Sequence, residues 1–205
     1  HADYVFSYGS KIDDVIKSIP VDASKIIAIP TGIEAAWLNQ DIKATGKIKK
    51  FLFIGRYERR KGIQELTAAI AKITNTLCEF HFIGPIPPEH QLKKDNVIYH
   101  GSINNQEEIK NITRNCDVLI CPSYSEGMPN VIMEGMASGL AIIASNVGAV
   151  NLLIDSSNGY LLELNELNNL HQIINQFNEI SAEAIDKMKK NAVDKIKHNF
   201  LWTDI

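Results

Sequence analysis

The chain has 205 residues, of which 45% are apolar and 22% charged, an ordinary balance for a globular protein with a substantial buried core. Its 21 basic and 24 acidic residues give a formal net charge of −3, so no overall positive field indicates a nucleic-acid partner. Three cysteines without C-x-x-C spacing indicate neither a disulfide framework nor a zinc site and fit a reduced, cytoplasmic setting. No apolar run approaches the roughly 18 residues of a membrane span.

The first 50 residues contain two short strand patterns with a short helix between them. Residues 3–7 and 25–29 are typical of strands, and residues 11–17 are typical of one or two helical turns. The second strand pattern ends at Pro30, and the polar, lysine-rich residues 39–50 predict an exposed linker.

From residue 50 onward, strand and helix patterns alternate along the chain. Strands separated by helices predict right-handed βαβ units and a parallel sheet covered on both faces, which is a Rossmann-like, three-layer α/β domain with a mostly parallel sheet. Ligands of such sheets bind beyond the carboxyl ends of the strands, where the strand order reverses. The predicted strands are residues 50–54, 79–83, 96–100, 117–121 and 141–145, and the predicted helices are residues 63–73, 106–115, 130–138, 167–177 and 181–198.

The stretch 123–139, S-Y-S-E-G-M-P-N-V-I-M-E-G-M-A-S-G, follows one of the buried strands and leads into a short helix. Free N–H groups and the positive end of the dipole suit the start of that helix to an anion or to sugar hydroxyls. Glu126 and Glu134 would be roughly 12 Å apart if both were helical. That exceeds the roughly 5 to 9.5 Å of a glycoside hydrolase pair, so we expect the two acids to hold different ends of one elongated ligand.

A second polar loop, G-R-Y-E-R-R-K-G at residues 55–62, follows another predicted strand. Its Arg56 guanidinium and Lys61 ammonium could neutralise a diphosphate without a metal ion. The alternative is a solvated basic turn, since Arg59 and Arg60 stand in the same loop. Both loops leave strand carboxyl ends, so we expect them to converge on one crevice.

Together these segments resemble the donor-binding signature of retaining glycosyltransferases of family 4, also called group 1, which have the GT-B fold. The seventeen-residue stretch carries most of the resemblance, and the G-R-…-K-G loop and the H-G-S-I turn at residues 100–103 extend it. The resemblance covers nearly all of residues 2–202. It implies that residues 1–205 are a single C-terminal, nucleotide-sugar-binding domain, one half of a GT-B enzyme whose N-terminal acceptor domain we expect to be absent from this chain.

The resemblance also implies a role for individual residues. Arg56 and Lys61 would grip the two donor phosphates and stabilise the leaving group, and Glu126 would lie at the transferred sugar, so these three are the expected catalytic residues. Glu134 would hold the ribose, and Ile103 would pack on the base. The other expected donor contacts are Gly55, Gly127, Met128, Pro129, Asn130 and Val131.

The implied reaction transfers a sugar from a UDP-, GDP- or ADP-sugar to an acceptor hydroxyl, with retention at the anomeric carbon and without a cofactor or metal. The expected acceptor is a glycan or a lipid-linked molecule of polysaccharide biosynthesis, bound through the missing N-terminal domain. This chain alone is therefore expected to be inactive, and the full-length protein to be cytoplasmic or peripheral at the inner face of the membrane. Two alternatives stay open: a GT-B nucleotide-sugar epimerase, and a non-catalytic sugar-nucleotide-binding module.

The chain departs from the family pattern at two turns. Thr31 and Glu34 replace the usual Asn and Asp of an I-P-N-G-x-D turn, and Gly148-Ala149 replaces the more common Gly-Gly. Other catalytic signatures do not occur: the sequence contains no H-E-x-x-H, G-x-S-x-G or G-x-G-x-x-G. Metal-dependent hydrolase, serine hydrolase and dinucleotide-binding functions are thus not indicated.

Overall fold

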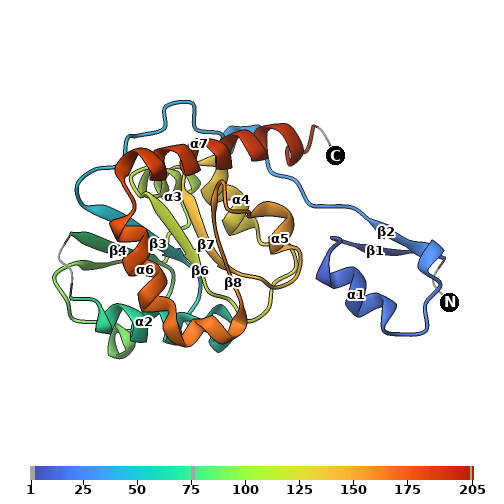
Figure 1. Ribbon diagram of the computed structural model, residues 1–205, viewed down its shortest axis with the longest axis horizontal. Coiled ribbons are helices and arrows are strands. Elements are labelled where there is room, and N and C mark those ends of the chain that lie inside the picture. The colour runs from blue at the N-terminus through green and yellow to red at the C-terminus, as the bar shows by residue number, and fades with distance from the viewer. Residues whose placement is uncertain (1–2, 75–76, 204) are drawn as a thin grey trace.

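A computed structural model describes residues 3–74, 77–203 and 205, and within them the strands form two parallel sheets (Figure 1). The small sheet pairs β1 (Val5–Ser7) with β2 (Ile26–Ala28), joined by α1 (Lys11–Lys17). The large sheet has the strand order β5-β4-β3-β6-β7-β8, and all its neighbours are parallel. Its strands are β3 (Lys49–Ile54), β4 (Cys78–Ile83), β5 (Val97–Gly101), β6 (Val118–Cys121), β7 (Ala141–Ser145) and β8 (Gly159–Leu162).

Helices cover both faces of the large sheet, as βαβ connections require (Figure 1). One face packs against α3 (Gln106–Thr113), α4 (Asn130–Ala137), α5 (Val150–Leu153) and the later turns of α7 (Ala182–Asn199). The other packs against α2 (Ile63–Lys72) and α6 (Leu170–Glu179). The predicted Rossmann-like three-layer fold is therefore confirmed.

The sequence patterns located the elements of the large sheet closely, with two omissions. All five predicted strands and the five predicted helices are present with shifts of a few residues. The edge strand β8 and the short helix α5 were not predicted. Each has only four residues, which is too short for hydrophobic periodicity to separate it from a loop.

The strand order places a ligand crevice between β3 and β6. From β3 the chain moves outward through β4 to β5, then returns to the other side of β3 to form β6. Connections from these two neighbouring strands therefore leave in opposite directions, and the loops beyond their carboxyl ends flank an opening. The two polar loops singled out in the sequence are those that follow β3 and β6.

The predicted exposed linker at residues 39–50 is instead fastened to the large domain. Thr45 is buried, its N–H and hydroxyl both donate to Asp186 Oδ1, at 2.8 and 2.7 Å, and Asn39 Nδ2 donates to the Ser138 carbonyl at 3.1 Å. Lys49 already belongs to β3 and is buried. Seven of the twelve residues are exposed, as predicted, but polar, lysine-rich composition does not reveal that most of the others are bonded to the rest of the protein.

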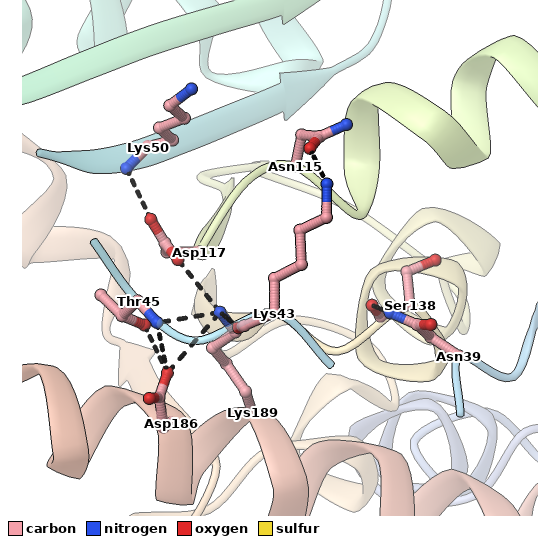
Figure 2. A network of polar contacts seen from close by, with 9 residues as sticks. All are labelled: Asn39, Lys43, Thr45, Lys50, Asn115, Asp117, Ser138, Asp186 and Lys189. Carbon is pink, nitrogen blue, oxygen red and sulfur yellow. Dashed lines mark hydrogen bonds and ion pairs between the residues drawn. The ribbon is translucent and has the colours of Figure 1, made fainter. Parts of the chain in front are cut away.

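A buried lysine on α7 holds this segment in place (Figure 2). Lys189 is only 1% exposed, and its Nζ lies 2.7 Å from the Lys43 carbonyl oxygen and 3.0 Å from Asp117 Oδ1. The second carboxylate oxygen of Asp117 accepts from the Lys50 backbone N–H at 2.9 Å. One cation thus ties α7 to the linker and to the start of β6, and each of its neighbours has a partner.

The small sheet reaches the crevice of the large one. Lys11 Nζ donates to the Asn146 carbonyl, in the loop after β7, at 2.7 Å. The Tyr8 ring lies so close to Gly127 that a Cβ at Gly127 would be 3.0 Å from it. In the part of the chain that the structure describes, no helix combines the length and apolar character needed to cross a membrane.

Candidate functional site

The loops after β3 and β6 meet, as predicted. The Tyr124 N–H donates to the Arg60 carbonyl at 2.8 Å, and Arg60 Nη1 donates to the Ser125 carbonyl at 3.3 Å. Gly62 makes this approach possible: its φ is +65°, and a Cβ there would lie 1.9 Å from the Pro122 carbonyl oxygen. Only glycine fits such a contact, so the end of the basic loop packs directly on the end of β6.

Within this junction, Lys61 and Glu126 form an ion pair. Lys61 Nζ lies 2.7 Å from Glu126 Oε1, and the two side chains are only 19% and 8% exposed. Arg60 contributes a second cation, whose Nη1 lies 3.7 Å from Glu126 Oε2. Arg56, by contrast, is 67% exposed, and its Nε lies 3.1 Å from Glu58 Oε1. The structure therefore brings Lys61 and Glu126 together in a largely buried pair and leaves Arg56 exposed.

Four backbone amides at the start of α4 have no acceptor. Those of Gly127, Met128, Asn130 and Val131 donate no hydrogen bond to any described residue, and no side chain caps the helix. The Met128 side chain is buried in the core, so only its backbone is available to a ligand. Four unused donors at the positive end of a helix dipole suit phosphate oxygens or sugar hydroxyls, as the sequence predicted.

The loop after β7 packs against the backbone of Glu126 and Gly127, next to these amides. Gly148 has a φ of +59°, and a Cβ there would lie 2.1 Å from the Glu126 carbonyl oxygen. The Ala149 N–H donates to the Gly127 carbonyl at 2.8 Å, and the Ala149 side chain is fully buried. The Gly148-Ala149 pair therefore fits this loop, since the second position needs no space beyond an alanine.

Glu134 lies one turn into α4 and is half-buried without a partner. Its carboxylate forms no hydrogen bond or ion pair with the residues that the structure describes. Burial, and secondarily the nearby Glu34 carboxylate, raises the pKa of Glu134. A half-buried, unpaired carboxylate is a strong acceptor for ligand hydroxyls. The helical spacing of about 12 Å does not apply to the two glutamates, because Glu126 lies before the helix.

The remaining predicted contacts stand at the strand ends. Ile103 follows β5 and packs partly buried against the core beneath α3 and α4. The Gly55 N–H is already bonded to the Ile83 carbonyl at 2.9 Å, so this amide is not free for a ligand. Pro129 immediately precedes α4 and is buried, so it shapes the loop without donating.

Sequence reasoning missed three side chains near the crevice. Arg60 was weighed only as part of a solvated basic turn, although it contacts the Glu126 carboxylate. Tyr8 follows β1 and Lys11 begins α1, and no local pattern could show that this part of the chain reaches the loops after β6 and β7. Among the residues placed by the structure, no group of three or more His, Cys, Asp or Glu side chains is arranged to hold a metal ion.

These features define an α/β domain with unused backbone donors and an unpaired carboxylate near the point where its strand order reverses. A family model described as glycosyl transferases group 1 matches residues 48–179, which include both loops and α4. The chain belongs to the group 1 glycosyltransferase family, and its fold is one half of the GT-B arrangement.

Known proteins agree with this assignment. The chain is 30% identical over 210 residues to an Escherichia coli enzyme named UDP-Gal:alpha-D-GlcNAc-diphosphoundecaprenol alpha-1,3-galactosyltransferase, covering 90% of this chain and 53% of that protein. It is 26% identical over 186 residues to a Bacillus subtilis protein named as a teichuronic acid biosynthesis glycosyltransferase, covering 86% and 47%. The structure of Anabaena HepE in complex with UDP-glucose superposes with a TM-score of 0.79 at 18% identity, covering 98% and 60%. The chain thus spans about half the length of the curated relatives it matches.

Proposed function

We propose that this chain binds a nucleoside diphosphate sugar in the crevice between β3 and β6, for transfer of the sugar to an acceptor hydroxyl with retention at the anomeric carbon. The observation that carries the proposal is the set of unused polar groups around the start of α4. Four free amides and the unpaired Glu134 carboxylate follow Glu126 along the loop after β6 and into α4, and Glu126 itself is paired with Lys61. Buried or half-buried polar groups without partners mark a place where a ligand supplies them.

Each part of the donor has a matching group in the crevice. The diphosphate is the partner for Arg56 and Lys61 together with the free amides, and these positive groups stabilise charge as it develops on the leaving nucleoside diphosphate. Glu134 accepts hydrogen bonds from the ribose hydroxyls, Ile103 packs on the base, and Glu126 contacts the transferred sugar. Because cationic side chains and amides supply the positive charge, we propose that no metal ion is needed.

A uridine nucleotide and a lipid-linked acceptor are the first choices to test. The names of the Escherichia coli relative and of the Anabaena HepE complex both contain a UDP-sugar, and the former also names a diphosphoundecaprenol-linked acceptor. On this proposal the full-length protein works at a membrane surface, where a lipid-linked acceptor is found.

The test of donor binding is the Tm shift of this chain with UDP-, GDP- and ADP-sugars. A ligand at about 100 times its Kd adds about 2.7 kcal/mol to the free energy of unfolding. We expect a shift with one nucleotide class, lost in Glu134→Ala and kept in Glu183→Ala, an exposed glutamate at the start of α7. No shift with any nucleotide, or an equal shift in Glu134→Ala, would contradict the proposed site.

Retention is tested on the full-length protein with a lipid-linked acceptor. Proton NMR of the product reports the anomeric configuration of the new bond, and retention predicts the configuration of the donor. An inverted product would refute that part of the proposal. Isomerised donor without transfer would instead favour an epimerase, and binding without turnover would favour a non-catalytic module.

A further inference from the structure

Glu126 faces two cations from adjacent positions of one loop. Lys61 Nζ is 2.7 Å from Oε1 and Arg60 Nη1 is 3.7 Å from Oε2, so each carboxylate oxygen has its own positive neighbour. The Glu126 side chain is 8% exposed, whereas the Arg60 side chain is 45% exposed. The closer of the two cations is Lys61, which the proposed function assigns to the donor phosphates.

On the proposed function, donor binding separates Lys61 from Glu126, and the second cation then remains beside the carboxylate. Lys61 has to turn from Glu126 toward the diphosphate, and a buried carboxylate that loses its cation is strongly disfavoured. We propose that Arg60 is a positioning residue that keeps the Glu126 carboxylate paired, and therefore in place, when Lys61 moves to the donor diphosphate. This inference rests on the proposed function. It assigns a role to Arg60, which lies in the loop but is not one of the four residues that define the G-R-…-K-G pattern.

The surroundings of Arg60 fit this exchange. Its guanidinium already donates to the Ser125 carbonyl at 3.3 Å and lies 3.4 Å from Glu58 Oε2, so the side chain is held at the loop junction. A planar guanidinium has several donors and can add a closer contact to Glu126 without losing these. Glu58 pairs with Arg56 as well, so this one carboxylate links Arg56 and Arg60.

No other cation is placed to do the same within the described chain. Beneath Glu126 lies the Cys121 thiol, whose pKa is raised to about 11 by burial and by the Glu126 carboxylate, so it is uncharged at neutral pH. The loop after β7 approaches Glu126 with the Gly148 backbone, which carries no charge. Lys11 of α1 is not available, because its ammonium donates to the Asn146 carbonyl. Arg59 points away, toward Glu65 and the Tyr124 ring.

The test measures UDP and UDP-glucose binding by calorimetry. For Arg60→Gln we expect about tenfold weaker binding, because Glu126 is left without a cation when Lys61 contacts the diphosphate. Arg60→Lys keeps the positive charge and should recover most of the lost affinity. Arg59→Gln removes the same charge from the same turn and controls for long-range attraction, so it should leave the affinity close to that of the wild type.

Equal weakening by Arg59→Gln and Arg60→Gln, with no recovery in Arg60→Lys, would overturn the inference.

A second measurement needs no nucleotide and so separates this inference from the proposed function. Lys61→Gln mimics the departure of Lys61, and unfolding equilibria are compared for Arg60→Gln, Lys61→Gln and the double variant. If Arg60 pairs with Glu126 once Lys61 is gone, the two substitutions together should be worse than additive. The folding equilibrium constant of the double variant should be at least about fivefold lower than the product of the two single effects predicts. Additive losses would contradict the exchange.

Discussion

The polar cluster around Lys189 and the crevice around Glu134 lie in the same domain, yet their polar groups are paired very differently. Lys189 bonds to the Lys43 carbonyl and the Asp117 carboxylate, and Asp117 bonds in turn to a backbone N–H (Figure 2). Around Glu134, four amides and the carboxylate itself have no partner among the described residues.

This difference separates a structural cluster from a binding site. A buried charge with partners on every side contributes to the folded state and leaves nothing for a ligand. Unpaired groups cost stability in the free protein, and a ligand that pairs them regains it. We therefore expect substitutions in the first region to change stability without changing affinity, and substitutions in the second to do the reverse.

The largest expected effect is that of Lys189→Met. Removal of the ammonium leaves the Asp117 carboxylate buried without its cation, and breaking a buried pair in this way costs about 3 to 5 kcal/mol of the free energy of unfolding. Urea denaturation measures the loss, and Lys190→Met, at the exposed neighbouring position, is the control. Well below its Tm, Lys189→Met should bind UDP as the wild type does. A loss under 1 kcal/mol, or a loss of affinity, would mean that the cluster is not the fastening described here.

The opposite behaviour is expected of Glu134→Ala. Loss of hydrogen bonds to a charged acceptor predicts UDP binding weaker by about 1.5 to 3 kcal/mol, roughly a 10- to 100-fold rise in Kd. Calorimetry with UDP measures this, and urea denaturation should show little loss of stability, because the carboxylate is unpaired in the free chain. Destabilisation comparable to that of Lys189→Met would show that Glu134 has a structural role instead.

A pH series distinguishes the two regions further. The pKa of Glu134 is raised above its ordinary value of 4.5, so the folded state holds that proton more tightly than the unfolded state. Its contribution to stability is then full below about pH 4.5 and declines as the pH rises through the folded-state pKa. Relative to the wild type, Glu134→Gln should become steadily more stable across that window. A difference between the two proteins that does not change with pH would contradict the raised pKa.

The smallest effect is expected at the surface pair of Asp155 with Lys195, which lies on the same helix as Lys189. Hydrogen bonds from Lys195, then from Ser157, lower the pKa of Asp155 to about 2, but half of the Asp155 side chain is exposed. Solvent screening limits the cost of Asp155→Asn to under about 1 kcal/mol at pH 7. The lowered pKa means that this contribution is present above about pH 3.8 and lost as the pH falls toward 2. A larger cost, or one that persists at pH 2, would show that burial is not what distinguishes Lys189.

Sequence patterns were sufficient for five of the six strands of the large sheet and for both polar loops. Long apolar runs and a seventeen-residue signature are local features, so Lys61, Glu126 and Glu134 could be identified before their positions were known. What escaped prediction depends on contacts between distant segments. The pairing of Thr45 with Asp186 spans 141 positions, and the contact of Arg60 with Glu126 requires the two loops to meet. Neither spacing nor composition reports such contacts.

The most direct test of the central claim is an amide proton–nitrogen NMR spectrum of the labelled chain, recorded with and without UDP-glucose. The account predicts that the resonances of Gly127, Met128, Asn130 and Val131 move, because these unused amides receive acceptors from the ligand. The amides of Thr45 and Lys50, which are already bonded, should stay in place. Shifts confined to other parts of the chain, with these four resonances unchanged at saturation, would contradict the assignment of this crevice as the donor site.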